Sequence, residues 1–426
     1  MSKFIIKGPS RLAGTFQPVG NKNAALPMIA AALLTEEPVT LNNVPRIVDV
    51  QVMLDLLASL GATVEQKGSR VTLRAAKLRK RRLDPVLCAK VRSSILFAGP
   101  LAARHGRAIL SPPGGDGIGR RRIDTHVYGL RALGIAVEGG RAWTFRRKQL
   151  RGTEILMDEA SVTATENVLM AAVLAEGVTT IFNAACEPHV QDLGNLLNKM
   201  GARIEGLGTN LIRIEGVPSL HGATHDVGPD YIELGSFLAA AAATRGELIA
   251  ENFDGGPRYM DVLQKSFGRL GVAWTTADGR LTLSARQKLR VQRDLGQAIP
   301  KIEDGPWPAF PSDLMSVALV LATQAKGTML FFEKMFESRM YFVDRLIEMG
   351  AHIIQCDPHR VIVTGASRLH SMTVSTPDIR AGMSMIVAAL CAKGETVIEN
   401  AQIIDRGYER IDERLRALGA DIVRAS

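Results

Sequence analysis

Cysteine and long apolar runs are scarce in this chain, and each scarcity argues against a class of protein. The four cysteines (Cys88, Cys186, Cys356 and Cys391) are scattered, with no Cys-x-x-Cys pair, which speaks against a disulfide scaffold and a zinc site. The sequence lacks the run of about 18 apolar residues that a membrane-spanning helix needs, and its first residues are too polar for a signal peptide. We therefore expect a cytoplasmic, reduced protein that binds no metal and no other cofactor.

The composition is that of a globular protein with a positive charge. Of 426 residues, 46% are apolar and 22% are charged, and this length suits two or three domains. The formal net charge of +9 indicates either a nucleic-acid surface or a site for small anions. Because the basic run Lys77–Arg82 has no interleaved aromatics and no reader motif, we interpret it as a solvated loop. We expect no nucleic-acid, membrane or obligate protein partner.

Internal repetition is the most informative pattern. Six times an amphipathic helical pattern ends in a Leu-Gly or Met-Gly pair before an alternating strand pattern, at intervals of roughly 70 residues. The glycines of the pairs are Gly61, Gly134, Gly201, Gly271, Gly350 and Gly419. Glycine suits the left-handed position just after a helix. Alanine-rich helices followed by strands interleave with this series, and turn residues close a hairpin in each of the first five units.

The sixth unit places the domain boundary. After the strand pattern 420–423 the sequence stops at Ser426, whereas a spare strand pattern, Lys3–Lys7, lies before the first helix. We expect this N-terminal strand to complete the sixth unit. The prediction is then one domain of repeats 1–3 over residues 22–228, which carries the loop 111–122, and a second domain of repeats 4–6 formed by 1–21 and 229–426. Two crossings would form a hinge around a cleft.

The repeats also place polar residues in register. Five of the six turns before a second helix hold an arginine and one a glutamate: Arg46, Arg121, Glu187, Arg258, Arg339 and Arg406. Helix starts and arginines both favour anions. We expect Lys22, Arg92, Arg121, Arg380 and Arg406 to converge without equal compensating acids, and therefore to bind a small ligand with several negative charges. The glycine-rich loop 111–122 is not a P-loop and not a dinucleotide fingerprint; it suits a mobile lid.

Several motifs together resemble the UDP-N-acetylglucosamine 1-carboxyvinyltransferase (enolpyruvyl transferase) family, in a variant with aspartate on the lid. They are Gly20–Pro27, Pro113–Gly119, Ala164–Asn167, Pro308–Asp313 and Ile404–Glu409. The likeness covers essentially the whole chain. It implies an α/β fold known as the inside-out α/β barrel, with two domains and six βαβαββ-type repeats, three in each domain.

The resemblance also implies substrates and roles. Enolpyruvyl would pass from phosphoenolpyruvate to the 3-hydroxyl of UDP-N-acetylglucosamine, through a tetrahedral intermediate, with release of phosphate, as the first committed step of peptidoglycan precursor synthesis. Asp116, Asp313 and Lys22 would be catalytic. Lys22 and Arg406 would hold phosphoenolpyruvate near Arg92, Arg121 and Arg380, and Asn23 and Asp313 would contact the sugar. The nucleotide would lie along Arg121, Arg122, Ile123, Asp124 and Thr125, along Glu159, Ala160, Ser161 and Val162, and beside Met335.

Some positions depart from the family pattern. Asp116 stands where most members have the cysteine that fosfomycin alkylates, so the resemblance implies insensitivity to that drug. Arg122 replaces a usual proline, Thr163 a usual glycine, Glu159 a frequent lysine and Ser338 a frequent asparagine. A carboxylate at 159 would repel a diphosphate, and Arg122 could offset it. Three alternatives remain: a different nucleotide acceptor, shikimate 3-phosphate as acceptor, and a non-catalytic paralogue that binds nucleotide sugars.

Overall fold

The computed structural model describes residues 2–252 and 259–425; Arg258, one of the six turn residues above, lies outside them. The chain divides into two compact units. One, here the N-terminal unit, comprises residues 19–115 and 121–228. The other, the C-terminal unit, comprises residues 1–18, 116–120 and 229–426. The segment 116–120 from the middle of the predicted lid therefore belongs to the C-terminal unit.

The N-terminal unit contains three sheets, with strand orders β13-β3-β5-β4, β6-β8-β7 and β11-β12-β10-β9. Its elements are α1 (Lys22–Ala31), η1 (Ala32–Leu34), β3 (Val39–Asn42), α2 (Val48–Ser59), β4 (Thr63–Lys67), β5 (Arg70–Arg74), α3 (Pro85–Cys88), η2 (Arg92–Phe97), α4 (Ala98–His105), β6 (Arg107–Leu110), α5 (Asp124–Ala132), β7 (Ile135–Glu138), β8 (Trp143–Arg147), β9 (Glu154–Leu156), α6 (Val162–Ala172), β10 (Val178–Phe182), α7 (Pro188–Lys199), β11 (Arg203–Glu205), β12 (Leu211–Glu215) and β13 (Thr224–Asp226).

The C-terminal unit repeats this plan with sheets β15-β16-β14-β2, β17-β18-β20-β19 and β21-β22-β1-β23. Its elements are β1 (Lys3–Gly8), β2 (Ala13–Phe16), α8 (Tyr231–Ala243), β14 (Glu247–Ala250), α9 (Tyr259–Gly268), β15 (Thr275–Ala277), β16 (Arg280–Leu283), η3 (Leu295–Gln297), β17 (Lys301–Glu303), η4 (Ser312–Leu314), α10 (Met315–Gln324), β18 (Gly327–Phe332), α11 (Val343–Glu348), β19 (Ile353–Gln355), β20 (Arg360–Gly365), β21 (Thr373–Ser375), α12 (Ile379–Cys391), β22 (Gly394–Glu399), η5 (Ala401–Arg406), α13 (Ile411–Ala417) and β23 (Asp421–Ala425).

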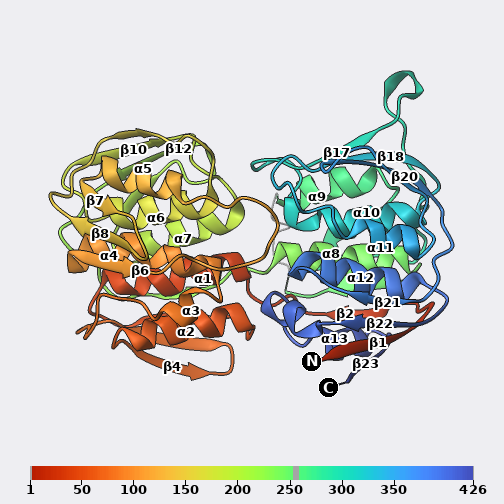
Figure 1. Cartoon of the computed structure of the whole chain (residues 1–426), viewed down its shortest axis with the longest axis horizontal. Helices are drawn as coiled ribbons and strands as arrows, with labels where there is room; N and C mark the ends of the chain where they lie inside the picture. Colours follow the sequence, from red (N-terminus) through yellow and green to blue (C-terminus); the bar gives the residue numbers. More distant parts are fainter. Residues whose placement is uncertain (1, 253–258, 426) are drawn as a thin grey trace. The chain divides into compact units, whose positions relative to one another are not determined.

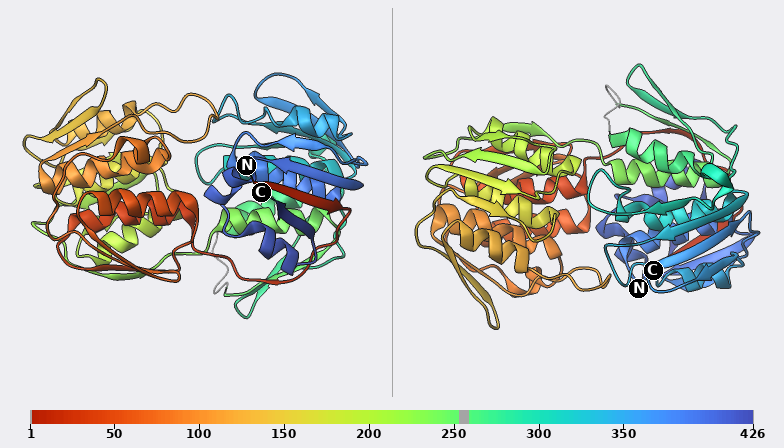
Figure 2. Two further views of the ribbon diagram at one scale, coloured as in Figure 1. Left: turned by 60° about the horizontal axis from the view of Figure 1, so that its bottom comes forward. Right: turned by 90° about the horizontal axis from the view of Figure 1, so that it is seen from above.

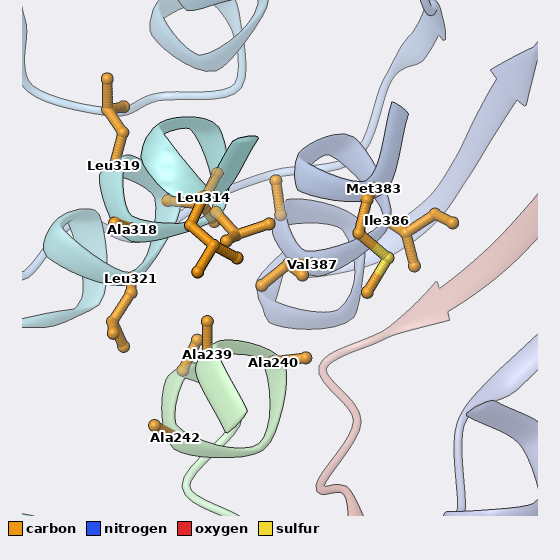
Figure 3. Close-up of a cluster of buried hydrophobic side chains, with 14 of the residues drawn as sticks. Ala239, Ala240, Ala242, Leu314, Ala318, Leu319, Leu321, Met383, Ile386 and Val387 are labelled. Carbon is orange, nitrogen blue, oxygen red and sulfur yellow. The ribbon is translucent and has the colours of Figure 1, made fainter. Parts of the chain in front are cut away.

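In each unit helices form the centre, and the sheets lie outside them (Figures 1 and 2). In the C-terminal unit these helices are α8, α10 and α12, which pack against one another (Figure 3). Every residue of α8 is buried. A helix that is apolar on all sides must lie in a core, and the alanines Ala239, Ala240 and Ala242 let its neighbours approach closely. The α/β class and the repeated architecture predicted from the sequence are thereby confirmed.

The glycine series predicted from the sequence lies where expected. All six glycines follow the second helix of their repeat, and their φ angles run from 81° at Gly271 to 103° at Gly61. At Gly134 an added Cβ would lie 1.9 Å from the backbone oxygen of Gln149. Both backbone conformation and space therefore require glycine there.

The N-terminal strand completes the sheet of the sixth repeat, as the sequence predicted. β1 lies between β22 and β23, antiparallel to both, with Ile5 opposite Val397 on one side and Val423 on the other. The two ends of the chain are thus held in one sheet.

The residue patterns did not reveal a fourth, parallel strand that borders five of the six sheets, although the βαβαββ repeat that the family resemblance implies includes a strand before its first helix. These strands are β2, β9, β13, β17 and β21. Each is only three or four residues long, too short for a period-two pattern to stand out. β13 directly precedes α8 yet pairs with β3, and β2 precedes α1 yet pairs with β14. β13 therefore belongs to the N-terminal unit and β2 to the C-terminal unit, although the helix that follows each strand belongs to the other unit.

Within residues 2–252 and 259–425, no helix has both the length and the apolar character needed to cross a membrane.

Candidate active site

In the C-terminal unit, two arginines hold the carboxylate of Asp313. Asp313 lies in η4, directly before the core helix α10. Its Oδ1 accepts a hydrogen bond from Arg339 (3.0 Å) and its Oδ2 one from Arg380 (2.8 Å). Both guanidinium groups are almost fully buried, while 28% of the Asp313 side chain is exposed. The two arginines therefore orient the carboxylate, and part of the Asp313 side chain remains exposed.

Arg380 is positioned by the start of α12. Asp378 caps this helix by accepting bonds from the backbone N–H groups of Arg380 (2.8 Å) and Ala381 (3.0 Å). The Arg380 guanidinium also lies over the ring of Tyr408, 5.4 Å from its centroid, a distance that suits a cation–π contact. Burial raises the pKa of Asp378, against the opposing effect of Arg339.

Asp116 and Arg406 form an ion pair in the same unit. Arg406 is the last residue of η5, and both side chains are largely buried. Asp116 is the lid residue that stands in the place of the family's cysteine. In this structure the carboxylate of Asp116 therefore pairs with Arg406, an arginine that we expect to bind the anionic substrate.

The lid residues that follow Asp116 lie against the turn after β18. The Ser338 N–H donates to the backbone oxygen of Ile118 (3.1 Å), and the Arg120 N–H donates to Glu337 Oε2 (3.1 Å). Gly119 has a φ of 127°, a backbone conformation that favours glycine. Ser338, one of the departures from the family, takes part through its backbone.

In the N-terminal unit, Lys22 forms a buried ion pair with Asp49. Lys22 is the first residue of α1, which Asn21 caps, and its Nζ lies 2.8 Å from Asp49 Oδ2. Lys22 is one of the five cations that we expected to converge without equal compensating acids, and three of these five have an acidic partner. Lys22 has Asp49, Arg380 has Asp313, and Arg406 has Asp116. Asp313 lies at a helix start that the repeat pattern aligns with that of Arg380, whereas Asp49 and Asp116 lie at positions that the pattern does not align.

A pocket of about 840 Å³ lies in the N-terminal unit at the start of α5. Four arginines line it: Arg92, Arg121, Arg122 and Arg131. Burial, together with the charge of Arg121, lowers the pKa of Arg92 to about 10. An anion bound here would offset the repulsion between these two cations. Tyr128 and Trp143, which the sequence analysis did not single out, also line the pocket.

Arg122 is linked to the acidic residues around it. Its Nε lies 2.5 Å from Asp124 Oδ2. The pKa of Arg122 is raised chiefly by Asp124, and Asp158 and Glu159 act in the same direction. Arg122 therefore lies within electrostatic reach of Glu159, so two departures from the family pattern influence each other through their charges.

Thr163, another departure, belongs to a buried hydrogen-bond chain. Asn167 donates through Nδ2 to Nδ1 of His126 (3.0 Å), so the other ring nitrogen of His126 carries the hydrogen and donates to Thr163 Oγ1 (3.0 Å). Asn167 also bonds the backbone of Ile95 and Gly99. The chain ties α5 to α6, the two helices whose starts hold the predicted nucleotide residues. Sequence reasoning missed His126, although its place on α5 was a signal.

The other predicted residues lie at the starts of helices or in loops. In the N-terminal unit Asn23 follows Lys22 in α1, Ile123 precedes α5, and Asp124 and Thr125 begin that helix. Glu159 and Ala160 precede Ser161, the N-cap of α6, and Val162 is its first residue. In the C-terminal unit Met335 follows β18 and is 41% exposed. Across the described parts of the chain, no cluster of three or more His, Cys, Asp or Glu residues suits a metal ion.

Comparison with known proteins defines the class. A family model described as EPSP synthase (3-phosphoshikimate 1-carboxyvinyltransferase) matches residues 6–415, so the chain belongs to this family of enolpyruvyl transferases. The enolpyruvyl transferase NikO from Streptomyces tendae superposes with a TM-score of 0.88 at 23% identity, covering 100% of this chain and 99% of that one. At that identity the likeness establishes the fold.

Particular relatives lie closer in sequence. A protein of Treponema denticola named UDP-N-acetylglucosamine 1-carboxyvinyltransferase is 52% identical over 423 residues, 99% of each chain. One of the same name from Bradyrhizobium diazoefficiens is also 52% identical, covering 99% of this chain and 98% of the relative. The family resemblance drawn from the sequence motifs is confirmed.

Proposed function

We propose that this chain transfers the enolpyruvyl group of phosphoenolpyruvate to the 3-hydroxyl of UDP-N-acetylglucosamine and releases phosphate, the first committed step of peptidoglycan precursor synthesis. The observation that carries the proposal is the 52% identity, over 99% of both chains, to a relative named for this activity. A cytoplasmic location belongs to the same proposal. So does the division into a domain of residues 22–228 and one of residues 1–21 and 229–426.

Asp313 is the proposed base. It accepts the proton of the sugar 3-hydroxyl while that oxygen attacks C2 of phosphoenolpyruvate and C3 gains a proton. The tetrahedral intermediate then loses a proton from C3 and expels phosphate. The contacts of Arg339 and Arg380 with Asp313 support this role, because they fix the orientation of its carboxylate. Lys22, Arg92, Arg121 and Arg406 are the proposed partners of the phosphate and carboxylate, whose charge they stabilise.

Asp116 is the proposed acid that delivers the proton to C3. Its ion pair with Arg406 suggests how the substrate switches it on. An incoming phosphoenolpyruvate anion competes for Arg406, and a carboxylate released beside that anion is favoured in its protonated form. Substrate binding and formation of the acid are then one event.

The nucleotide is proposed to lie along residues 121–125 and 159–162, with Asn23 at the sugar and Met335 beside the nucleotide. Glu159 would repel a diphosphate, but Arg122 lies close enough to interact with it. Relative to the family pattern, the positive charge has moved from position 159 to position 122. This exchange supports UDP-N-acetylglucosamine as the acceptor despite the departures.

A phosphate-release assay with a panel of acceptors tests the proposal. We expect release from phosphoenolpyruvate with UDP-N-acetylglucosamine, and none with shikimate 3-phosphate or without acceptor. Release with another nucleotide sugar alone would identify a different acceptor, and binding without release would identify a non-catalytic paralogue. Closure of the two domains on the nucleotide sugar stays a prediction, which a fall in the radius of gyration on ligand addition would support.

A further inference from the structure

Two acidic residues outside the predicted site directly follow neighbouring strands of one sheet. β17 and β18 are parallel, with Glu303 opposite Phe332, so the residues that follow them, Asp304 and Glu333, emerge at the same edge of the sheet. Both are 0% exposed. Burying two carboxylates side by side is costly unless they are neutralised or bonded.

A proton shared between the two carboxylates would lower the cost of burying them. The Glu333 carboxyl lies within hydrogen-bonding reach of Asp304, and among the described residues no donor reaches Asp304 Oδ2. Two facing carboxylate oxygens repel each other, whereas one proton between them forms a hydrogen bond. Burial, reinforced by Asp304, raises the pKa of Glu333 to about 9. At neutral pH Glu333 is therefore the acid and Asp304 the acceptor.

The remaining oxygens of the pair hold a turn. Asp304 Oδ1 accepts from the backbone N–H of Lys334 (2.5 Å), and Glu333 Oε1 accepts from those of Met335 and Phe336 (3.1 Å each). Three successive N–H groups are thus bound by two side chains. The Ser312 hydroxyl also donates to Glu333, at 3.1 Å to Oε1 and 3.0 Å to Oε2.

The two segments that the pair holds, Ser312 and the turn 334–336, both connect to Asp313. Ser312 directly precedes Asp313, and the turn continues to Arg339, which bonds Asp313 Oδ1. The same turn carries Glu337 and Ser338, which bind lid residues 118–120. We propose that Asp304 and Glu333 are positioning residues, whose shared proton fixes the orientation of Asp313 and the surface on which the lid docks. This inference rests on the proposed function, because it assigns the pair a role in that reaction.

The neighbouring charges leave the proton in place at neutral pH. Arg339 opposes it by favouring ionised Glu333, but its guanidinium also bonds Asp313. Lys334 extends to Glu303 (3.0 Å). His359, before β20, donates from Nδ1 to the backbone oxygen of Glu333 (2.7 Å). Above the pKa of Glu333, two buried negative charges would face each other and loosen the turn.

Two variants of Glu333 separate a shared proton from simple packing. Glutamine keeps both a donor toward Asp304 and an acceptor for the turn, whereas alanine removes both. We expect Glu333→Gln to stay within about threefold of the wild-type kcat at pH 7.5, and Glu333→Ala to lose at least about tenfold, the scale of a broken buried hydrogen bond. We also expect kcat to fall less above pH 9 in Glu333→Gln than in the wild type. Glu348→Gln, on the exposed end of α11, is the matched control.

A second measurement does not depend on activity. Infrared spectra at pH 7.5 should show a protonated-carboxyl band in the wild type that Glu333→Gln lacks and the control retains. Melting temperatures should fall less between pH 5 and pH 9 in Glu333→Gln, because the wild type loses the stability tied to its bound proton. Identical carboxyl bands in Glu333→Gln and the wild type would overturn the proposal, even if Glu333→Ala fails to fold. If the wild type transfers no enolpyruvyl group, the proposed function fails, while the infrared result still decides whether the proton is shared.

Discussion

Asp313 Oδ2 lies 2.8 Å from a guanidinium nitrogen of Arg380, a residue 67 positions further along the chain. Asp313 lies in η4, which directly precedes α10, and Arg380 is the second residue of α12, and these two helices pack together in the same core. The contact joins equivalent places of two consecutive repeats. A carboxylate held in this way keeps its direction without help from the substrate, as the proposed role of a base requires.

The first prediction concerns this base. Asp313→Ala should lower kcat by at least about a hundredfold, the usual scale for loss of a general base, while binding of the nucleotide sugar stays largely intact. Steady-state phosphate release and calorimetric titration measure the two effects. Asp344→Asn, at an exposed position in the first turn of α11, is the control. Near-normal turnover in Asp313→Ala would show that another group removes the proton.

The second prediction concerns Asp116. A carboxylate is a poor nucleophile beside a thiolate, so activity should survive long incubation with fosfomycin. Asp116→Cys should remain active and become sensitive to the drug. Among the cysteines only Cys356 is exposed, so an adduct confined to Cys356 in an active enzyme is compatible with this prediction. Fosfomycin bound covalently to Asp116, seen by mass spectrometry, would contradict it.

The third prediction concerns the exchange of charge between Arg122 and Glu159. Arg122→Ala should raise the KM for UDP-N-acetylglucosamine by about two- to fivefold and leave kcat unchanged, the modest effect expected for solvated charges. Combining it with Glu159→Lys should restore the KM. Both effects should shrink at high salt, because screening weakens exposed pairs. If Glu159→Lys does not rescue Arg122→Ala, the two residues do not compensate each other.

The fourth prediction concerns stability in acid. Burial, together with Arg92, lowers the pKa of His126 to about 3. Since the unfolded chain takes up this proton near the ordinary pKa of His, about 6.5, the folded protein should lose stability as the pH falls from there toward 3, by about 2 kcal/mol at pH 5. His126→Gln should show a shallower loss in thermal unfolding between pH 4 and pH 8. His221→Gln, at an exposed histidine, should behave as the wild type; equal slopes for all three proteins would refute the assignment.

Local patterns predicted much of the fold. A helix period of 3.6, a strand period of two and a glycine with positive φ are properties of short segments, so the six glycines and the hairpins were readable without tertiary information. The spare strand Lys3–Lys7 was placed in the sixth sheet by counting repeats. The short parallel strands such as β9 and β17 were expected only through the βαβαββ repeat that the family resemblance implies, because three residues carry no detectable period and their pairing depends on a neighbour distant in the chain.

The candidate site divides in the same way. The sequence by itself determined the family, the repeat register and the positions of Lys22, Asp313 and Arg406, because these depend on which residues follow one another. Only the tertiary structure decided which ionisable side chains pair: Lys22 with Asp49, Arg406 with Asp116, and Asp304 with Glu333. These pairs form between side chains that folding brings together from separate segments, and their charge states follow from burial. Neither proximity nor burial is a property of residue order.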